Sequence, residues 1–358
     1  MKVLFWVPYP TEGASNRYRV EQFLPYLKQA GIKYTLHPFW SSAAFEVLYK
    51  EGRYLKKMCF FFKGALFRIS DILGIDKYDV VFIHREAFSV GGVFLEGILS
   101  ALKKPFIFDF DDAIFLPSSS RHNSFMEKLK NPQKITKIIR LSSSVIAGNA
   151  YLADFALRYN PNVSIIPTCI DTDRYYPEQP RHNEEVTIGW IGSVTTLNFL
   201  KILEKVFIRL SERFPQVKFK IIGGIFSING LSNITSIPWS MESEMEELKS
   251  FDIGIMPMPD NEWTRGKCGF KAILYMSMAI PCVCSAVGVN KEIIVDGKNG
   301  FLAETEEDWL NKLSLLIEDS HLRKRIGDEG RSAVQERYSV RANAAKFLKI
   351  IQMTRRIK

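Results

Sequence analysis

Short apolar stretches alternate with longer stretches of helical periodicity along this chain of 358 residues. In the first half, the short stretches that we interpret as strands are residues 2–8, 33–37, 79–84, 104–110, 144–147 and 163–166. In the second half they are residues 186–191, 217–222, 234–237, 253–256 and 281–284. Between them, apolar residues recur every three or four positions, which predicts helices over residues 19–30, 197–214, 241–250, 306–319 and 321–338. Such alternation is typical of parallel sheets covered by helices, so we predict an α/β protein.

A polar segment, residues 177–185, separates the two series of strands. It holds two prolines and almost no apolar residue, as a linker does. We therefore predict an N-terminal Rossmann-like domain over residues 1–176 and a C-terminal Rossmann-like domain over residues 186–340. Residues 341–358 are expected to form a helix that could pack back on the first domain. Because doubly wound sheets bind ligands at the carboxyl ends of their strands, a cleft between two such domains is the expected site.

Composition and charge narrow the class of protein further. No run approaches the roughly 18 uncharged apolar residues of a membrane span, and the N-terminus does not resemble a signal peptide, so we expect a cytoplasmic protein. The formal net charge is +9. No helix-turn-helix, zinc finger or aromatic stacking module accompanies that charge, which argues against nucleic acid as a partner.

Part of the positive charge lies in one segment, residues 46–69, where lysines and arginines alternate with Phe60, Phe61, Phe62 and other apolar residues. A basic, aromatic helix can lie on an anionic bilayer, with rings in the interface and cations at the lipid head groups. A core helix with a solvated charged face explains the same pattern. The sequence leaves both interpretations open. The first would place the protein at the inner face of the cytoplasmic membrane.

The turn over residues 263–271 combines two glycines with Arg265, Lys267 and Lys271 just before an apolar, helical stretch. A helix N-terminus offers unpaired N–H groups and a partial positive charge, and glycines let a ligand approach the backbone. A nucleoside diphosphate would suit such a turn. The alternative is a solvated basic turn of an ordinary αβ unit.

The segments after this turn resemble a known family. Gly-Lys-Cys-Gly-Phe-Lys over 266–271, Val-Gly-Val-Asn over 287–290 and Asp-Gly-Lys-Asn-Gly-Phe over 296–301 look like the C-terminal half of bacterial group 1 glycosyltransferases, also called glycosyltransferase family 4. Residues 188–193, 166–171 and 108–113 resemble one branch of that family. The resemblance implies the GT-B architecture, in which two Rossmann-like domains face each other across a cleft. It also implies sugar transfer from a nucleotide-diphosphate sugar as co-substrate, with no cofactor and no metal.

In the first domain, the resemblance places two groups of residues at the cleft. The loop after the first strand supplies Gly13, Arg17 and Arg19, and the loops after later strands supply His84, Arg85, Asp109, Asp111 and Asp112. We assign Asp111 and Asp112 as the catalytic candidates, because close carboxylates can raise one another's proton affinity, hold a divalent cation or bind sugar hydroxyls. The alternatives are surface arginines and a buried ion pair between Arg85 and one of the acids. A one-domain nucleotide-sugar enzyme would use the Asp-x-Asp for a metal, but the basic turn does not fit that fold.

In the second domain, the candidate donor-binding residues are Gly192, Ser193, Arg265, Lys267, Gly269, Phe270, Lys271 and Glu292. The family usually places two glutamates around the signature helix, one for the donor sugar and one for the nucleotide ribose. Here those positions are Gly266 and Leu274. A leucine accepts no hydrogen bond, so either Glu292 or another acid replaces the ribose contact, or nucleotide binding is weak.

The leading hypothesis from the sequence is a retaining glycosyltransferase that moves a sugar to a glycan or lipid-linked acceptor in bacterial surface polysaccharide assembly. The missing glutamates motivate a second hypothesis, a binding or scaffold protein related to such enzymes. A nucleotide-sugar epimerase of the same architecture is the third. Turnover of a nucleotide-sugar donor would distinguish them.

Overall fold

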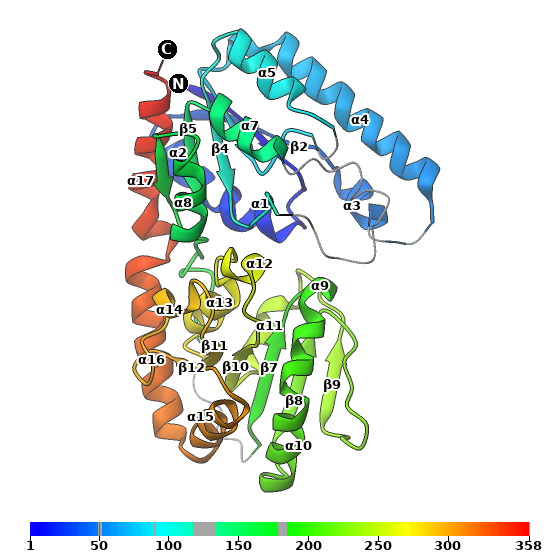
Figure 1. The fold of residues 1–358 in the computed structure, drawn as a ribbon, viewed down its shortest axis with the longest axis vertical. Coiled ribbons are helices and arrows are strands. Elements are labelled where there is room, and N and C mark those ends of the chain that lie inside the picture. The colour runs from blue at the N-terminus through cyan, green and yellow to red at the C-terminus, as the bar shows by residue number, and fades with distance from the viewer. Residues whose placement is uncertain (49, 51, 89–90, 117–132, 178–184, 358) are drawn as a thin grey trace. The chain divides into compact units, whose positions relative to one another are not determined.

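The computed structural model describes residues 1–358 apart from 49, 51, 89–90, 117–132, 178–184 and 358. The described residues divide into two compact units: Met1–Cys169 with Asn343–Lys358, and Ile170–Ala342. Each unit contains one sheet of six parallel strands (Figure 1). The predicted α/β fold with two parallel sheets is therefore confirmed.

Unit 1 is built on a sheet of strand order β2-β1-β3-β4-β5-β6. The strands are β1 (Lys2–Val7), β2 (Lys33–Pro38), β3 (Val80–His84), β4 (Phe106–Phe110), β5 (Ser144–Ala147) and β6 (Val163–Ile165). Its helices are α1 (Ala14–Arg19), α2 (Leu24–Gln29), α3 (Ser42–Leu48), α4 (Tyr54–Leu73), α5 (Phe94–Ala101), α7 (Gln133–Leu141), α8 (Ala150–Leu157) and most of α17 (Val340–Thr354), with short 3₁₀ turns η1 (Glu21–Phe23) and η2 (Ile75–Lys77). The central strands β3 and β4 are buried along their whole length, as strands covered on both faces are.

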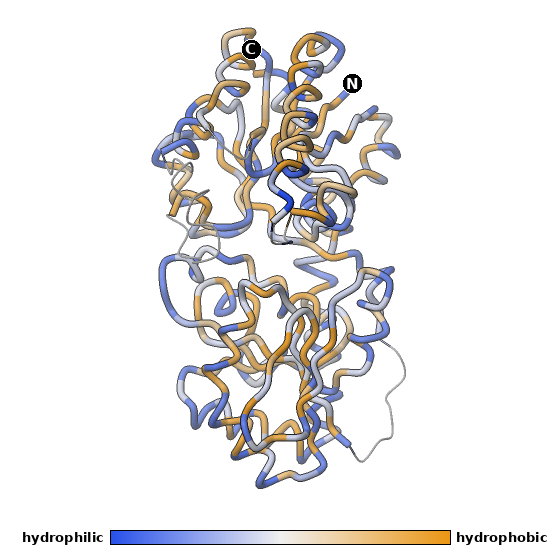
Figure 2. Tube along the Cα trace, turned by 90° about the vertical axis from the view of Figure 1, so that its right-hand side faces the viewer, coloured by the Kyte–Doolittle hydropathy of each residue, from blue (hydrophilic) through white to orange (hydrophobic). Residues whose placement is uncertain are grey.

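Unit 2 has the strand order β12-β11-β10-β7-β8-β9. The strands are β7 (Thr187–Ile191), β8 (Lys218–Ile222), β9 (Ile234–Ile237), β10 (Ile253–Met256), β11 (Cys282–Ser285) and β12 (Phe301–Ala303). The helices are α9 (Val194–Leu197), α10 (Glu204–Arg213), α11 (Glu244–Lys249), α12 (Glu262–Arg265), α13 (Phe270–Ser277), α14 (Asn290–Ile293), α15 (Glu306–Glu318) and α16 (Ser320–Arg337), and η4 (Asn198–Leu203) is a 3₁₀ helix. Figure 2 shows that hydrophobic residues, in orange, are concentrated in the interior segments of each unit.

Three predicted helices differ from the structure. The helix expected over residues 19–30 is broken at Val20, which has φ −126° and ψ −60°, and a helix restarts at Leu24 with a proline in its first turn. Proline favours a helix start because it lacks the N–H that an interior position needs. The helix expected over 197–214 is divided into α9, η4 and α10.

The basic segment 46–69 also forms two helices rather than one. Its residues lie in α3 and α4, separated by Gly52 and Arg53, whose φ angles are +70° and +56°. Helix α3 ends at Leu48, and because left-handed backbone cannot continue a right-handed helix, Gly52 and Arg53 set the start of α4 at Tyr54.

The chain returns to unit 1 through α17. Phe347 stacks on Phe23 with ring centroids 4.4 Å apart, and Thr354 Oγ1 donates a hydrogen bond of 2.9 Å to Ser144 Oγ. Tyr175 and Glu244 both belong to unit 2, where the Tyr175 hydroxyl donates a hydrogen bond of 2.7 Å to the Glu244 carboxylate. The predicted linker 177–185 lies largely outside the described residues.

Candidate functional site

In unit 1, a buried ion pair lies at the carboxyl end of β4. Arg19, the last residue of α1, forms a salt bridge with Asp109. Its Nη1 also donates a hydrogen bond of 2.7 Å to the carbonyl oxygen of Ile166. Arg19 is 2% exposed and Asp109 is 1% exposed. Burial alone would raise the pKa of Asp109, but the charge of Arg19 and the hydrogen bond from His84 outweigh burial and lower it. Asp109 is therefore a carboxylate.

His84, the last residue of β3, stands beside Asp109 because the two are register partners in neighbouring strands. Its Nδ1 lies 2.6 Å from Asp109 Oδ2. A carboxylate accepts, so Nδ1 carries a hydrogen, and Nε2 is the ring nitrogen left to contact another group. Nε2 is buried and makes no hydrogen bond to any residue that the structure describes. A buried polar atom without a partner is unusual, and a ligand hydroxyl would satisfy it.

A second pair follows on the same edge of the sheet. Arg85 has a left-handed backbone, φ +63°, and its N–H donates 2.7 Å to the carbonyl of Asp109. This conformation directs its guanidinium to Asp111, with Nε 2.9 Å from Oδ1. Burial would lower the pKa of Arg85, but the charges of Asp111 and Asp112 raise that pKa above its usual range. In turn, the charge of Arg85 holds the pKa of Asp111 below the ordinary value of an aspartate, although Asp111 is buried.

The hypothesis that these carboxylates raise one another's proton affinity is therefore wrong for Asp109 and Asp111. Each is compensated by its own arginine: the Arg85–Asp111 pair is the ion-pair alternative that the sequence left open, whereas the Arg19–Asp109 pair was not predicted. Asp112 accepts a hydrogen bond of 3.1 Å from the N–H of Ala113. Within the described ranges, no group of three or more His, Cys, Asp or Glu side chains could hold a metal ion.

The first loop of unit 1 differs from its prediction. Gly13 precedes α1, and a Cβ there would lie 2.4 Å from Tyr9 Cβ, so contact with Tyr9 requires the glycine. Arg17 and Arg19 were expected at the start of a helix but lie in the last turn of α1, because that helix begins at Ala14. Arg17 is buried at 5% exposure, and its Nη1 lies 3.5 Å from the carbonyl of Thr11.

In unit 2, two candidate donor-binding segments meet at Gly192. A Cβ on Gly192 would lie 2.5 Å from Trp190 Cζ2 and 2.9 Å from Lys271 Cε. Lys271 Nζ lies 5.4 Å from the centre of the buried Trp190 ring. The end of β7, the Ser193 N-cap of α9 and the first turn of α13 are thereby adjacent. Only glycine permits this approach.

The charge at this place is concentrated on two lysines. Burial and the neighbouring charge of Lys267 lower the pKa of Lys271 to about 8. Lys267 Nζ lies 3.7 Å from the centre of the Trp263 ring. Gly269, with φ +64°, is the N-cap of α13, an eight-residue helix that begins at Phe270. The first backbone N–H groups of this helix therefore lie close in the chain to Lys267 and Lys271. The helix N-terminus would stabilise an anion bound here, and the anion would in turn favour the charged form of Lys271.

Two other predicted donor residues are arranged differently. Arg265 has a side chain 51% exposed and is bound to Asp260 by hydrogen bonds of 2.6 and 3.1 Å. Glu292 is exposed on α14, and its carbonyl accepts from Arg337. Gly266, the C-cap of α12, and Leu274 are both buried, and Leu274 is 3% exposed. The structure thus places no carboxylate at either family position.

Sequence reasoning missed two residues that shape this half of the site. Trp190 provides the ring beneath Lys271, and its position in a strand gave no signal beyond hydrophobicity. Tyr275 accepts from the N–H of Ile191 at 3.1 Å and donates to the carbonyl of Ile255 at 3.2 Å. It therefore fixes the ends of β7 and β10 from inside α13, which a helical periodicity cannot reveal.

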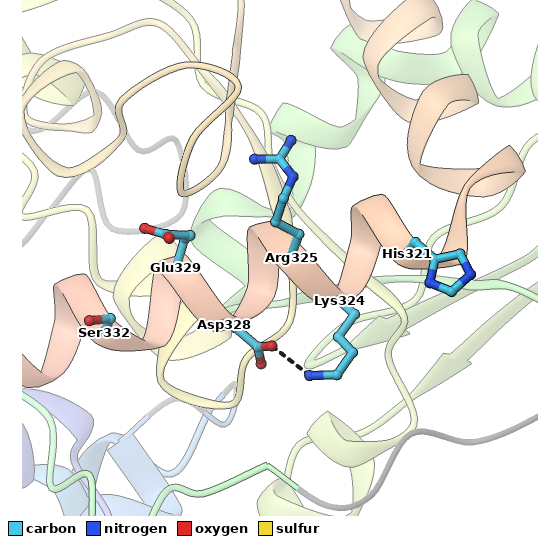
Figure 3. Close-up of a pocket in the computed structure, with 6 residues that line it drawn as sticks. All are labelled: His321, Lys324, Arg325, Asp328, Glu329 and Ser332. Carbon is cyan, nitrogen blue, oxygen red and sulfur yellow. Dashed lines mark hydrogen bonds and ion pairs between the residues drawn. The ribbon is translucent and has the colours of Figure 1, made fainter.

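One open hollow lies away from all of these residues. The side chains lining it come from a single helix, α16, and one pair of them, Lys324 and Asp328, is joined at 2.6 Å (Figure 3). The lining residues are His321, Lys324, Arg325, Asp328, Glu329 and Ser332. Figure 3 shows them spread along the helix rather than converging, so we assign this hollow no function.

The second half of the chain carries a family signature. Residues 185–319 match the family model of the group 1 glycosyl transferases. This segment holds every candidate donor-binding residue, and the resemblance predicted from the sequence is confirmed over it. Comparison with curated proteins gives no match.

Solved structures share the fold of the whole chain. Sucrose-phosphate synthase from Thermosynechococcus elongatus has a TM-score of 0.68 at 13% identity, covering 98% of both chains. A glycosyltransferase from Rickettsia africae has a TM-score of 0.67 at 15% identity, covering 99% of this chain and 98% of that one. HepE from Anabaena, solved with UDP and glucose, has a TM-score of 0.65 at 12% identity, covering 99% and 100%. These glycosyltransferase structures confirm the predicted GT-B fold class.

Proposed function

We propose that this protein is a retaining glycosyltransferase that moves a sugar from a nucleoside-diphosphate donor to a glycan or lipid-linked acceptor, in the assembly of bacterial surface polysaccharide. The observation that carries the proposal is the convergence of Gly192, Lys271 and the start of α13 inside the group 1 segment. HepE, of similar fold, was solved with UDP-glucose, so UDP-sugars are the first donors to test.

On the donor side, catalysis would be electrostatic. As the glycosidic bond breaks, negative charge grows on the departing diphosphate. Lys271, Lys267 and the N–H groups of α13 would stabilise that charge, and they are held in place before the reaction begins. These cations offer neutralisation without a metal, so we propose the nucleotide sugar as co-substrate and no cofactor.

On the acceptor side, His84 Nε2 would accept a hydrogen bond from a sugar hydroxyl, oriented by the bond from Nδ1 to Asp109. Asp111 and Asp112 remain our candidates for positioning the acceptor or the developing oxocarbenium ion. The ion pair with Arg85 keeps Asp111 charged for that role.

We expect His84→Asn to lower the rate of sugar transfer by roughly ten- to a hundredfold, because it removes one hydrogen bond of about 1–3 kcal/mol to the reacting sugar. The asparagine amide nitrogen occupies the place of Nδ1, so the bond to Asp109 survives. UDP affinity, measured by calorimetry, should not change, since the nucleotide binds in unit 2. Unchanged transfer by a folded His84→Asn protein would remove His84 from the site.

A second candidate function is a nucleotide-binding scaffold protein, favoured by the buried Leu274 at a position where relatives hold a carboxylate. Donor consumption decides between them. A panel of nucleotide sugars with and without acceptor glycans should give acceptor-dependent release of the nucleoside diphosphate from an enzyme. Binding of UDP with no release from any donor would favour the scaffold, and sugar isomerisation without acceptor would indicate an epimerase.

A further inference from the structure

Helix α4 lies on the outside of unit 1 (Figure 1). It exposes a row of large apolar side chains. Their exposed fractions run from 47% for Ile69 to 85% for Leu73. The row consists of Leu55, Met58, Phe62, Leu66, Ile69 and Leu73. Successive members are three or four residues apart, so they share one face of the helix. Contiguous exposed apolar surface of this kind marks an interaction site rather than ordinary surface.

The opposite face of α4 is fixed to the sheet. Arg68 is fully buried and donates to the carbonyls of Val7, His37 and Ala87 at 2.9–3.3 Å. Asp71 accepts from Trp6 Nε1 at 2.8 Å. The apolar row is therefore not the result of a loosely attached helix.

The hydrogen bonds of Arg68 show which part of unit 1 α4 packs against. Val7 and His37 belong to the carboxyl ends of β1 and β2. Nearby, Phe61 on α4 packs on Phe39 and Phe88, with ring centroids 5.4 and 5.7 Å away. The middle of α4 is thus adjacent to the sheet edge that carries His84 and Asp109.

The charges beside the row have one sign. Arg53, Lys56 and Lys63 are exposed, and the sequence has no aspartate or glutamate between Glu51 and Asp71. Within the described part of the chain, Lys56 and Lys63 form no ion pair. Two copies of this face would bring like charges together, whereas an anionic lipid surface complements both the cations and the apolar row.

We propose that the exposed face of α4 binds the surface of an anionic bilayer. No helix in the described residues is long and apolar enough to cross a membrane, so α4 lies on the lipid, with its rings and aliphatic chains in the interface and its cations at the head groups. This inference rests on the proposed function in one respect: docking of α4 would hold the carboxyl ends of β3 and β4, where we propose that the acceptor binds, near the membrane. That position fits a lipid-linked acceptor.

Cys59 provides a direct test, because it is exposed on α4 while the other four cysteines are buried. An environment-sensitive fluorophore on Cys59 should shift its emission to the blue with vesicles containing anionic phosphatidylglycerol. Neutral phosphatidylcholine vesicles should give at most a small shift, and added salt should reverse it. The measurement needs no nucleotide, so its outcome is independent of the proposed catalytic activity.

Sedimentation with vesicles then separates the two contributions. Phe62→Ser combined with Leu66→Ser should weaken binding at least about tenfold, and Lys56→Glu combined with Lys63→Glu at least about thirtyfold. Matched controls are Leu157→Ser on α8 and Lys201→Glu in unit 2, both exposed, which should bind as the wild type does.

Three results would overturn the proposal: no binding to anionic vesicles, equal loss in the control variants, or a blue shift that rises with protein concentration without lipid. The last, with a dimer in sedimentation velocity, would show that a second copy covers the face. Circular dichroism of each variant confirms that the changes leave the protein folded.

Discussion

Replacing Lys271 with methionine should weaken UDP binding by roughly ten- to a hundredfold, with almost no effect on the binding of uridine. Methionine keeps the contact with Trp190 and removes only the charge, and a charge-assisted hydrogen bond contributes about 1.5–3 kcal/mol. If charge grows on the diphosphate during transfer, the rate should fall further than the affinity. Calorimetry with both ligands, followed by transfer assays, measures the two losses.

The pH dependence provides an independent check on the same residue. Burial and the charge of Lys267 hold the pKa of Lys271 at about 8 in the free protein, so UDP affinity should fall as the pH rises through about 8, by a total no larger than the loss caused by Lys271→Met. Lys271→Met should abolish this dependence. Arg265→Ala should cost less than about threefold, because Arg265 is exposed and paired with Asp260. Equal losses for UDP and uridine, or a larger loss from Arg265→Ala, would contradict the assignment of Lys271.

The strands could be predicted from the sequence because buried parallel strands form uninterrupted apolar runs. Residues 234–237 and 253–256 were predicted with the bounds that β9 and β10 have. Helix ends were predicted less well where tertiary contacts override periodicity. At Val20, for example, the apolar pattern continues, but the helix ends and Arg19 is bound to Asp109.

Candidate residues could be predicted as members of loops but not as pairs. His84 and Asp109 each follow a recognisable strand, yet their contact depends on the register between β3 and β4, which the sequence does not encode in a readable way. Gly192 was predicted only as a donor-binding residue at the end of a strand, and the structure shows that Trp190 and Lys271 lie directly against it. Such contacts come from distant segments, and only packing reveals them.

Replacing Leu274 with glutamate should destabilise the protein by about 3–5 kcal/mol and leave UDP affinity unchanged. Leu274 is 3% exposed on α13, a helix buried on almost every side. The substitution loses the burial of the leucine and places a carboxylate where no water reaches it. For a unit of this size, the melting temperature should drop by roughly 10 °C. Leu274→Met, which conserves volume, should cost less than about 1.5 kcal/mol.

Melting curves and UDP titrations of the same samples decide what Leu274 means for function. A destabilised Leu274→Glu protein with wild-type affinity would show that this half of the site is packed without a ribose carboxylate, so the nucleotide must be held mainly by its phosphates. Leu315→Glu, at an exposed position of α15, controls for added negative charge and should change neither quantity. A Leu274→Glu protein of normal stability that binds UDP more tightly would instead show that the position faces the nucleotide. Leucine there would then be the reason for weak binding.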